Sequence, residues 1–217
     1  MHKIARSTAV RPLSVVFDIG GVLIDWNPRY LYRKLLPDEE SVEAFLRDVC
    51  SNEWNQQFDA GHIFSEGIAA LAAKHPEKAD LISAFWERWQ EMLGGEVPGT
   101  ADILRRLKRE NVPVHAISNW SAETFPIATK LYPFLHLFDV LVVSGREKMI
   151  KPGEEIFQHF LERSGLGAKD CIFIDDNAAN VAAANELGFH TVHFSTAEDL
   201  ERRLVALGLL SQSGLCP

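Results

Sequence analysis

The sequence predicts an α/β protein whose core is a parallel sheet, with an all-helical segment inserted after the first strand. From residue 100 onward, short apolar runs typical of buried strands alternate with helical patterns. Between residues 28 and 94 only helical patterns occur, and polar or glycine-rich breaks bound this segment. Because strands alternate with crossover helices, we expect the strands to run parallel.

The first strand is predicted at residues 13–17, an apolar run that leads into Asp18 and the glycine pair at 20 and 21. Paired glycines let the backbone turn sharply and approach a ligand closely. Asp18 then lies at the carboxyl end of a strand, where open α/β sheets bind ligands. An aspartate that only opens a turn would show the same local pattern.

The inserted segment follows the polar break at residues 25–28 and ends at the glycine-rich break 94–99. Apolar residues repeat at helical spacing over 42–49 and 82–93, and residues 65–74 form another predicted helix, ended by Pro76. We interpret the segment as a lid between two flexible joints. Helices that merely complete the main core would have the same composition.

The remaining chain supplies the rest of the predicted sheet, and the stretch after Gly208 is expected to fray. In order, the pattern predicts a helix carrying Ile103, Leu104 and Leu107, strands at 112–117 and 140–143, a helix over 156–161 closed by Gly165, a strand at 171–174, a helix through Val181 and Leu187 ended by Gly188, an edge strand at 190–194, and a helix carrying Leu200, Leu204 and Leu207.

Polar residues follow three of these strands, and all of them should meet at one edge of the sheet. They are Asp18, the pair Ser118-Asn119, and the pair Asp175-Asp176. An Asp-Asp pair alone often only caps a helix. Three neighbouring carboxylates would repel one another unless they shared a cation, and oxygen ligands in that number suit Mg²⁺. Lys151, just before a predicted helix, could reach in to bind an anionic substrate, although a solvated surface lysine would have the same local sequence.

These residues resemble the haloacid dehalogenase superfamily, whose members are mostly magnesium-dependent phosphatases. The resemblance spans about residues 13–195 and implies a helical cap at the position of the insertion. The wording Asp-Ile-Gly-Gly with Asp-Asp-Asn is most similar to the branch that contains bacterial sugar-1-phosphate phosphatases. Four motifs carry the resemblance to the superfamily. In order along the chain they are Phe17 to Leu23, Ile117 to Asn119, Lys151-Pro152, and Phe173 to Asn177 followed by Asn180.

We therefore expect a Rossmann-like hydrolase core formed by residues 1–26 and 96–217 and a helical cap formed by residues 27–95. The expected reaction is hydrolysis of a small phosphorylated metabolite, such as a sugar phosphate, through an aspartyl-phosphate on Asp18. The expected partner is this small substrate, and the chain is expected to be a monomer or a homodimer.

Each candidate residue has an expected role in that reaction. Asp18, the Gly20 carbonyl and Asp176 are expected to bind Mg²⁺, while Asp175 either joins through water or orients Lys151. The Ser118 hydroxyl, the Asn119 amide and Lys151 are expected to hold the transferring phosphate oxygens. In the insertion, Asn55 and Asp59 lie four residues apart and, on a helix, would present a polar face to hydroxyl-bearing substrates.

Gly20 departs from the family pattern, because most phosphatases that the chain resembles have at this position an aspartate that protonates the leaving group. Asp25, His62 or a bound water are candidate replacements. Two alternatives follow from the missing acid. In a metal-independent 2-haloacid dehalogenase Asp18 would attack carbon and expel halide, which needs no proton, but the resembled dehalogenases have serines where this chain has Asp175 and Asp176. A non-catalytic binding protein of the same fold is the other alternative.

Composition limits the possible partners and compartments. The formal charge of −8 over 217 residues argues against nucleic acid or an anionic membrane surface as a partner. No apolar run is long enough to span a membrane, and the start of the chain lacks the apolar stretch of a signal peptide. Three cysteines at wide spacing (Cys50, Cys171 and Cys216) suggest neither a disulfide framework nor a metal site. We therefore expect a cytoplasmic protein.

Overall fold

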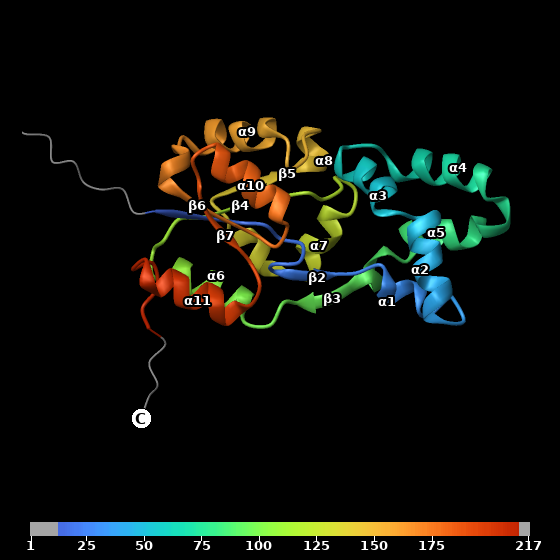
Figure 1. The fold of residues 1–217 in the computed structure, drawn as a ribbon, viewed down its shortest axis with the longest axis horizontal. Coiled ribbons are helices and arrows are strands. Elements are labelled where there is room, and N and C mark those ends of the chain that lie inside the picture. The colour runs from blue at the N-terminus through green and yellow to red at the C-terminus, as the bar shows by residue number, and fades with distance from the viewer. Residues whose placement is uncertain (1–12, 213–217) are drawn as a thin grey trace, which may run out of the picture.

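The computed structural model describes residues 13–212 and has the predicted α/β fold, with a parallel five-stranded sheet (Figure 1). The strand order is β5-β4-β1-β6-β7, so the first strand lies at the centre and β7 at one edge, as predicted. All four pairings in this sheet are parallel. The strands are β1 (Ser14–Phe17), β4 (Val114–Ser118), β5 (Val140–Val143), β6 (Cys171–Asp175) and β7 (His190–His193).

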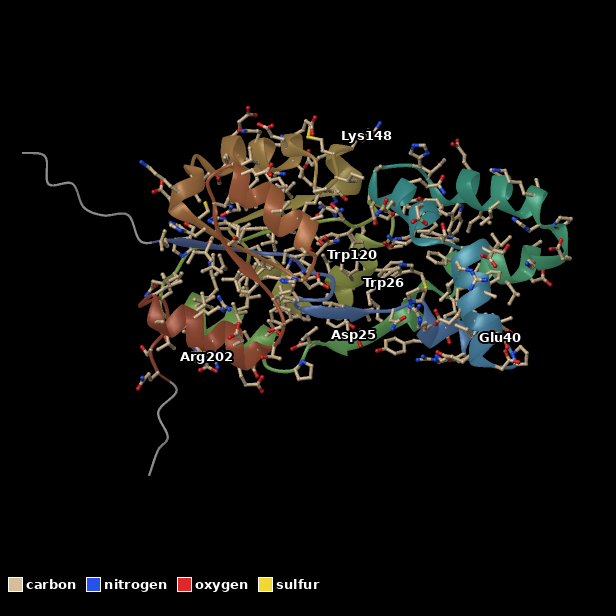
Figure 2. All side chains as sticks on the ribbon, in the orientation of Figure 1. Asp25, Trp26, Glu40, Trp120, Lys148 and Arg202 are labelled. Atoms are coloured by element: carbon tan, nitrogen blue, oxygen red, sulfur yellow. The ribbon has the colours of Figure 1, made fainter. Side chains whose placement is uncertain are left out.

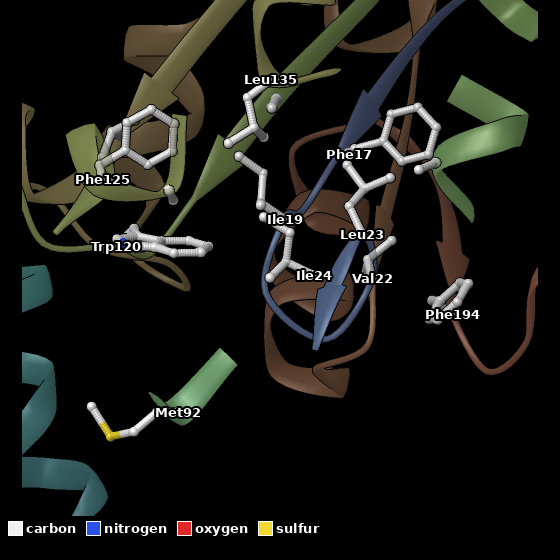
Figure 3. Packing of buried hydrophobic residues seen from close by; sticks show 14 of the residues in the cluster. Phe17, Ile19, Val22, Leu23, Ile24, Met92, Trp120, Phe125, Leu135 and Phe194 are labelled. Carbon is white, nitrogen blue, oxygen red and sulfur yellow. The ribbon is translucent and has the colours of Figure 1, made fainter. Parts of the chain in front are cut away.

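Helices cover both faces of this sheet because alternate strand residues point to opposite sides. Helices α9 (Glu154–Ser164) and α10 (Ala178–Glu186) lie on one face, and α6 (Thr100–Arg109) and α11 (Ala197–Ala206) on the other (Figure 1). Val16 of the central strand packs in the α9 cluster, whereas its neighbour Phe17 packs in the larger cluster shown in Figure 3. Because helices cover both faces of the sheet, we expect a ligand-binding site at the ends of the strands.

The inserted segment is a group of helices beyond the carboxyl ends of the strands (Figure 1). Its longer helices have amphipathic sequences and bury aromatic side chains among themselves; Phe58 and Phe64, for example, stack at 3.9 Å between ring centroids. The elements are α1 (Arg29–Tyr32), α2 (Glu39–Asp48), α3 (Asn52–Asp59), α4 (Phe64–Lys74), the 3-10 turn η1 (Pro76–Lys78), α5 (Ala79–Glu87) and the 3-10 turn η2 (Trp89–Met92).

The two joints of the insertion differ from the sequence expectation, because they pair with each other as strands. The helix expected to reach Leu93 ends at Glu87, and Leu93 instead opens β3 (Leu93–Glu96), which runs antiparallel to β2 (Ile24–Trp26). Glycine disfavours helix, and Gly95, which pairs with Asp25, has a φ of +110° at the point where the register of the two strands shifts. A two-stranded ribbon therefore connects the insertion to the sheet.

Shorter elements complete the chain between the strands. They are α7 (Phe125–Leu131), η3 (Pro133–Leu137), α8 (Ser144–Glu147) and η4 (Ala168–Asp170). The expected fraying after Gly208 is wrong for the next two residues, because Leu209 and Leu210 are buried against the core. The last residues, 213–217, and the basic start of the chain lie outside the described residues.

Two of the three cysteines, Cys50 and Cys171, are buried and free, and Cys216 lies outside the described residues. None of the helices formed within residues 13–212 combines the length and apolar character that crossing a membrane requires.

Candidate active site

Three strands bring their polar end residues to one edge of the sheet. β1 lies between β4 and β6, and Phe17 is in register with Ala116 on one side and Ile174 on the other. The next residues along the chain, Asp18 and Asp175, therefore lie side by side, and Ser118 ends the neighbouring strand. This is the convergence that the sequence pattern predicts.

Asp18 directly follows β1 and is buried, with 8% of its surface exposed. Two contacts hold one oxygen of its carboxylate in place. Oδ1 accepts a hydrogen bond from the backbone N–H of Ile19 at 2.7 Å and lies 2.9 Å from Lys151 Nζ. Burial raises the pKa of Asp18 to about 7, the positive charge of Lys151 opposes that rise, and the negative charges of Asp175 and Asp176 add to it. The site therefore holds more negative charge than its lysine offsets.

Lys151 has a fully buried side chain held between two carboxylates. Its Nζ donates to Asp175 Oδ2 at 2.7 Å, in addition to its contact with Asp18. Asp175 also accepts from the side-chain amide of Asn180 on both oxygens and from the backbone N–H of Asn177. With both oxygens engaged in this way, Asp175 is placed to orient Lys151.

The carboxylates of Asp18, Asp175 and Asp176 offer oxygen atoms that lie within 4.8 Å of one another. Asp176 is the most exposed of the three, and burial, followed by the charge of Asp175, raises its pKa. The turn at Gly21, whose φ is +73°, leaves room for the Asp176 carboxylate, because a Cβ on Gly21 would lie 2.3 Å from Asp176 Oδ2. A set of hard oxygen donors with excess negative charge fits Mg²⁺.

Ser118 and Asn119 lie at the same edge but differ in what they can offer. The Ser118 hydroxyl has no hydrogen-bond partner among the described residues, but Ser118 is fully buried and does not line the cavity described below. The Asn119 side-chain amide accepts from the backbone N–H of Lys151 at 2.8 Å and donates to its carbonyl at 2.9 Å. That amide therefore positions Lys151, and its NH2 group has a second N–H besides the one donated to the Lys151 carbonyl.

A cavity of about 230 Å³ separates the catalytic edge from the helical insertion. Figure 2 shows Trp120 and Trp26, two residues of its wall, where the insertion meets the core. Neither Asp25 nor His62, the side chains considered as replacement acids, is among its lining residues: Asp25 accepts a hydrogen bond from the Tyr30 hydroxyl at 2.5 Å, and His62 is exposed. The predicted site residues that line it are Asp18, Gly20, Asn55, Asp59, Asn119, Lys151 and Asp176.

Other lining residues were not expected from the sequence. Asn52 and Gln56 share the cavity-facing side of α3 with Asn55 and Asp59, and this three-to-four spacing of polar residues was a signal that could have found them. The aromatic and hydroxyl residues had no such signal, because they meet only in the folded chain. The further lining residues are Trp26, Phe64, Trp89, Trp120, Ser121 and Thr124, together with Asn177 and Asn180, which belong to the fourth sequence motif.

Comparison with known proteins matches residues 14–188 to the haloacid dehalogenase-like hydrolase family. The sesquiterpene phosphatase astK of Aspergillus oryzae is 28% identical over 183 residues, which cover 84% of this chain and 89% of that protein. The (S)-2-haloacid dehalogenase 4A of Burkholderia cepacia is 28% identical over 200 residues, covering 83% and 81%. Two other curated relatives are longer proteins, of which this chain spans 19% and 38%.

Among solved structures, the wild-type HAD family enzyme bt-2542 of Bacteroides thetaiotaomicron is 25% identical, with a TM-score of 0.67. The match covers 88% of this chain and 98% of that enzyme, which was solved in complex with magnesium and inorganic phosphate.

Proposed function

The chain belongs to the haloacid dehalogenase-like hydrolase family, and we propose that it is a magnesium-dependent phosphatase of a small phosphorylated metabolite. The observation that carries this proposal is the crowding of Asp175 and Asp176 beside Asp18, with donor oxygens within 4.8 Å. Such a cluster would repel an anionic substrate unless a cation offset its charge. A phosphate ester bound with Mg²⁺ meets that condition, and the bacterial structural relative binds magnesium and phosphate.

In the proposed reaction Asp18 attacks phosphorus and forms an aspartyl-phosphate, which water then hydrolyses. Lys151 and the Ser118 hydroxyl hold the transferring oxygens and stabilise the charge that builds on them. Mg²⁺, held by Asp18, the Gly20 carbonyl and Asp176, would offset the charge of the phosphoryl group. Asn119 and Asp175 keep Lys151 in place through the hydrogen bonds described above.

We also propose that residues 27–95 are a cap over a core formed by residues 1–26 and 96–217. The cavity supports this division, because α3 contributes one wall and the carboxyl ends of β1, β4 and β6 lie at the other. The β2–β3 ribbon is then the connection about which the cap would open for product release.

A 2-haloacid dehalogenase is the second candidate, favoured by Gly20 and by the dehalogenase among the relatives. Halide leaves without a proton, so the missing side chain at Gly20 would be harmless to that reaction. The paired Asp175 and Asp176 weigh against it, because they would repel a haloacid carboxylate in the absence of a cation.

Phosphate release from a panel of phosphorylated metabolites should depend on Mg²⁺. We expect chelation with EDTA to lower the rate by roughly 100-fold or more, because the cation offsets charge that Lys151 alone does not balance. Adding Mg²⁺ back should restore the rate. Phosphate release that chelation leaves unchanged would contradict the metal assignment, and halide release from a 2-haloacid without phosphate release would favour the dehalogenase.

Specificity should depend on the polar face of α3, where Asn55 and Asp59 line the cavity. Asn55 also lines a second cavity of about 420 Å³, which shares Trp26 and Asn52 with the first and could receive the organic part of an ester. We propose that Asn55 and Asp59 select among hydroxyl-bearing phosphate esters.

Asn55→Ala should change the preference among sugar phosphates by about 10-fold in kcat/KM while changing hydrolysis of para-nitrophenyl phosphate less. The reason is that Asn55 would touch the sugar and not the phosphate. Glu53→Ala, on an exposed position of the same helix, is the matched control. An equal loss on all esters would argue against a specificity role.

A further inference from the structure

The proposed reaction needs a proton that none of the described side chains at the catalytic edge is free to supply. A sugar or alkyl leaving group departs as an alcohol, so its oxygen must gain a proton as the P–O bond breaks. The titratable side chains that line the cavity are Asp18, Asp59, Lys151 and Asp176. Asp18 is the nucleophile, Asp176 is assigned to the metal, and Lys151 already donates to two carboxylates.

We propose that Asp59, contributed by the helical insertion, is the general acid and then the general base of the reaction; this inference rests on the proposed phosphatase function. Asp59 is the last residue of α3 and lies in the wall of the cavity that also contains Asp18 and Gly20. A Cβ placed on Gly20 would meet no atom within 4 Å, so the space over that residue is open to a group from the opposite wall.

The surroundings of Asp59 hold its carboxyl in place. The Asn55 side-chain amide donates to Asp59 Oδ2 at 3.4 Å. Aromatic side chains pack behind this part of the helix, with Trp54 and Phe58 at 4.8 Å between ring centroids. Asp59 is partly buried and lines the cavity.

The charge environment agrees with a proton that can be given and regained near neutral pH. Burial raises the pKa of Asp59 to about 7, the negative charge of Asp18 adds to the rise, and Lys151 and the backbone N–H of Ser121 oppose it. Helix α8 packs against α3, but its charged residues are engaged elsewhere. Arg146 lies over the Phe125 ring, and Glu147 pairs with Arg163 and His159.

The two half-reactions then balance in atoms and charge. In the first, an Asp18 oxygen bonds to phosphorus, the P–O bond to the leaving group breaks, and protonated Asp59 gives its proton to the departing oxygen. In the second, the Asp59 carboxylate takes a proton from water as the water oxygen bonds to phosphorus. The bond between phosphorus and Asp18 breaks, phosphate is released, and Asp59 is again protonated.

The test uses phenyl, para-nitrophenyl and dinitrophenyl phosphates, which have similar shape and increasingly good leaving groups. In Asp59→Asn we expect phenyl phosphate hydrolysis to fall by roughly 100- to 10,000-fold, because the poor leaving group no longer receives a proton. With dinitrophenyl phosphate, whose leaving group departs as an anion, the variant should release a rapid burst of dinitrophenolate, one equivalent per enzyme, followed by slow turnover. Asp80→Asn, an exposed position on α5, should retain wild-type rates.

The outcomes separate this role from the function on which it rests. If the wild type releases no phosphate from any of these esters or from sugar phosphates, the phosphatase proposal fails and the acid role fails with it. If the wild type is active but Asp59→Asn loses nothing, or loses the same factor on all three phenyl esters with no burst, only the acid role is overturned. A leaving-group-dependent loss in Asp25→Asn instead would also overturn it. A thermal unfolding curve matching the wild type confirms that the variant is folded.

Discussion

Asp18→Asn should abolish phosphate release while leaving the fold intact. The amide cannot form an aspartyl-phosphate, so we expect the rate to fall by roughly 10,000-fold or more. The fold should survive because the substitution keeps the size of the side chain and Lys151 retains its 2.7 Å contact with Asp175. It also removes one negative charge from a crowded cluster. Phosphate release and thermal unfolding should be measured on the same preparation.

Asp102→Asn is the matched control, since Asp102 is a highly exposed aspartate on α6, far along the chain from the catalytic edge. It should keep wild-type activity. Mass spectrometry of acid-quenched wild type should find a phosphoryl group on the peptide that contains Asp18. Turnover retained in Asp18→Asn would rule out the covalent mechanism.

The sheet and the residues at its edge could be predicted because their signals are local. The apolar strand runs are short and directly precede Asp18, Ser118 and Asp175, and parallel strands bring such positions to one edge. Helix ends could also be predicted from the sequence where a single residue type determines them. Gly165, for example, ends α9 with a φ of +66°.

The β2–β3 ribbon between the insertion and the core could not be predicted from local sequence signals of this kind. β2 and β3 are polar and glycine-containing, and their pairing joins Asp25 to Gly95 across about 70 residues of helix. No sequence feature near β2 or β3 indicates that the two strands pair with each other. The helical pattern of residues 82–93 predicts a helix through Leu93, whereas α5 ends at Glu87 and the 3-10 turn η2 leads into β3.

The cavity depends on contacts of the same non-local kind. Trp89 and Trp120 come together at 5.8 Å between ring centroids, from the insertion and from the end of β4. The use of the Asn119 amide by the main chain of Lys151 was equally hidden, because the two residues lie 32 positions apart. The sequence pattern could name Asn119 as a site residue, but its partner appears only in the folded chain.

Lys151→Ala should reduce both catalysis and stability, more than any other substitution among the phosphate-binding residues. Its Nζ is the cation between Asp18 and Asp175, and its side chain is fully buried. Removing it leaves two buried carboxylates without their partner, which should lower the free energy of unfolding by about 3–5 kcal/mol in the absence of metal. Thermal unfolding, with and without Mg²⁺, measures this loss, and Lys130→Ala on the surface of α7 is the control.

Catalytic efficiency should fall in Lys151→Ala by about 100- to 1000-fold when assayed below its unfolding temperature, because the positive charge nearest the transferring oxygens is gone. Ser118→Ala should cost less, about 10-fold, because it removes one neutral donor and no charge. The order of the two effects is the decisive measurement. Equal and small losses in kcat/KM would mean that neither side chain holds the phosphoryl group, whereas a larger loss at Lys151 matches a charge that acts most strongly as the P–O bond breaks.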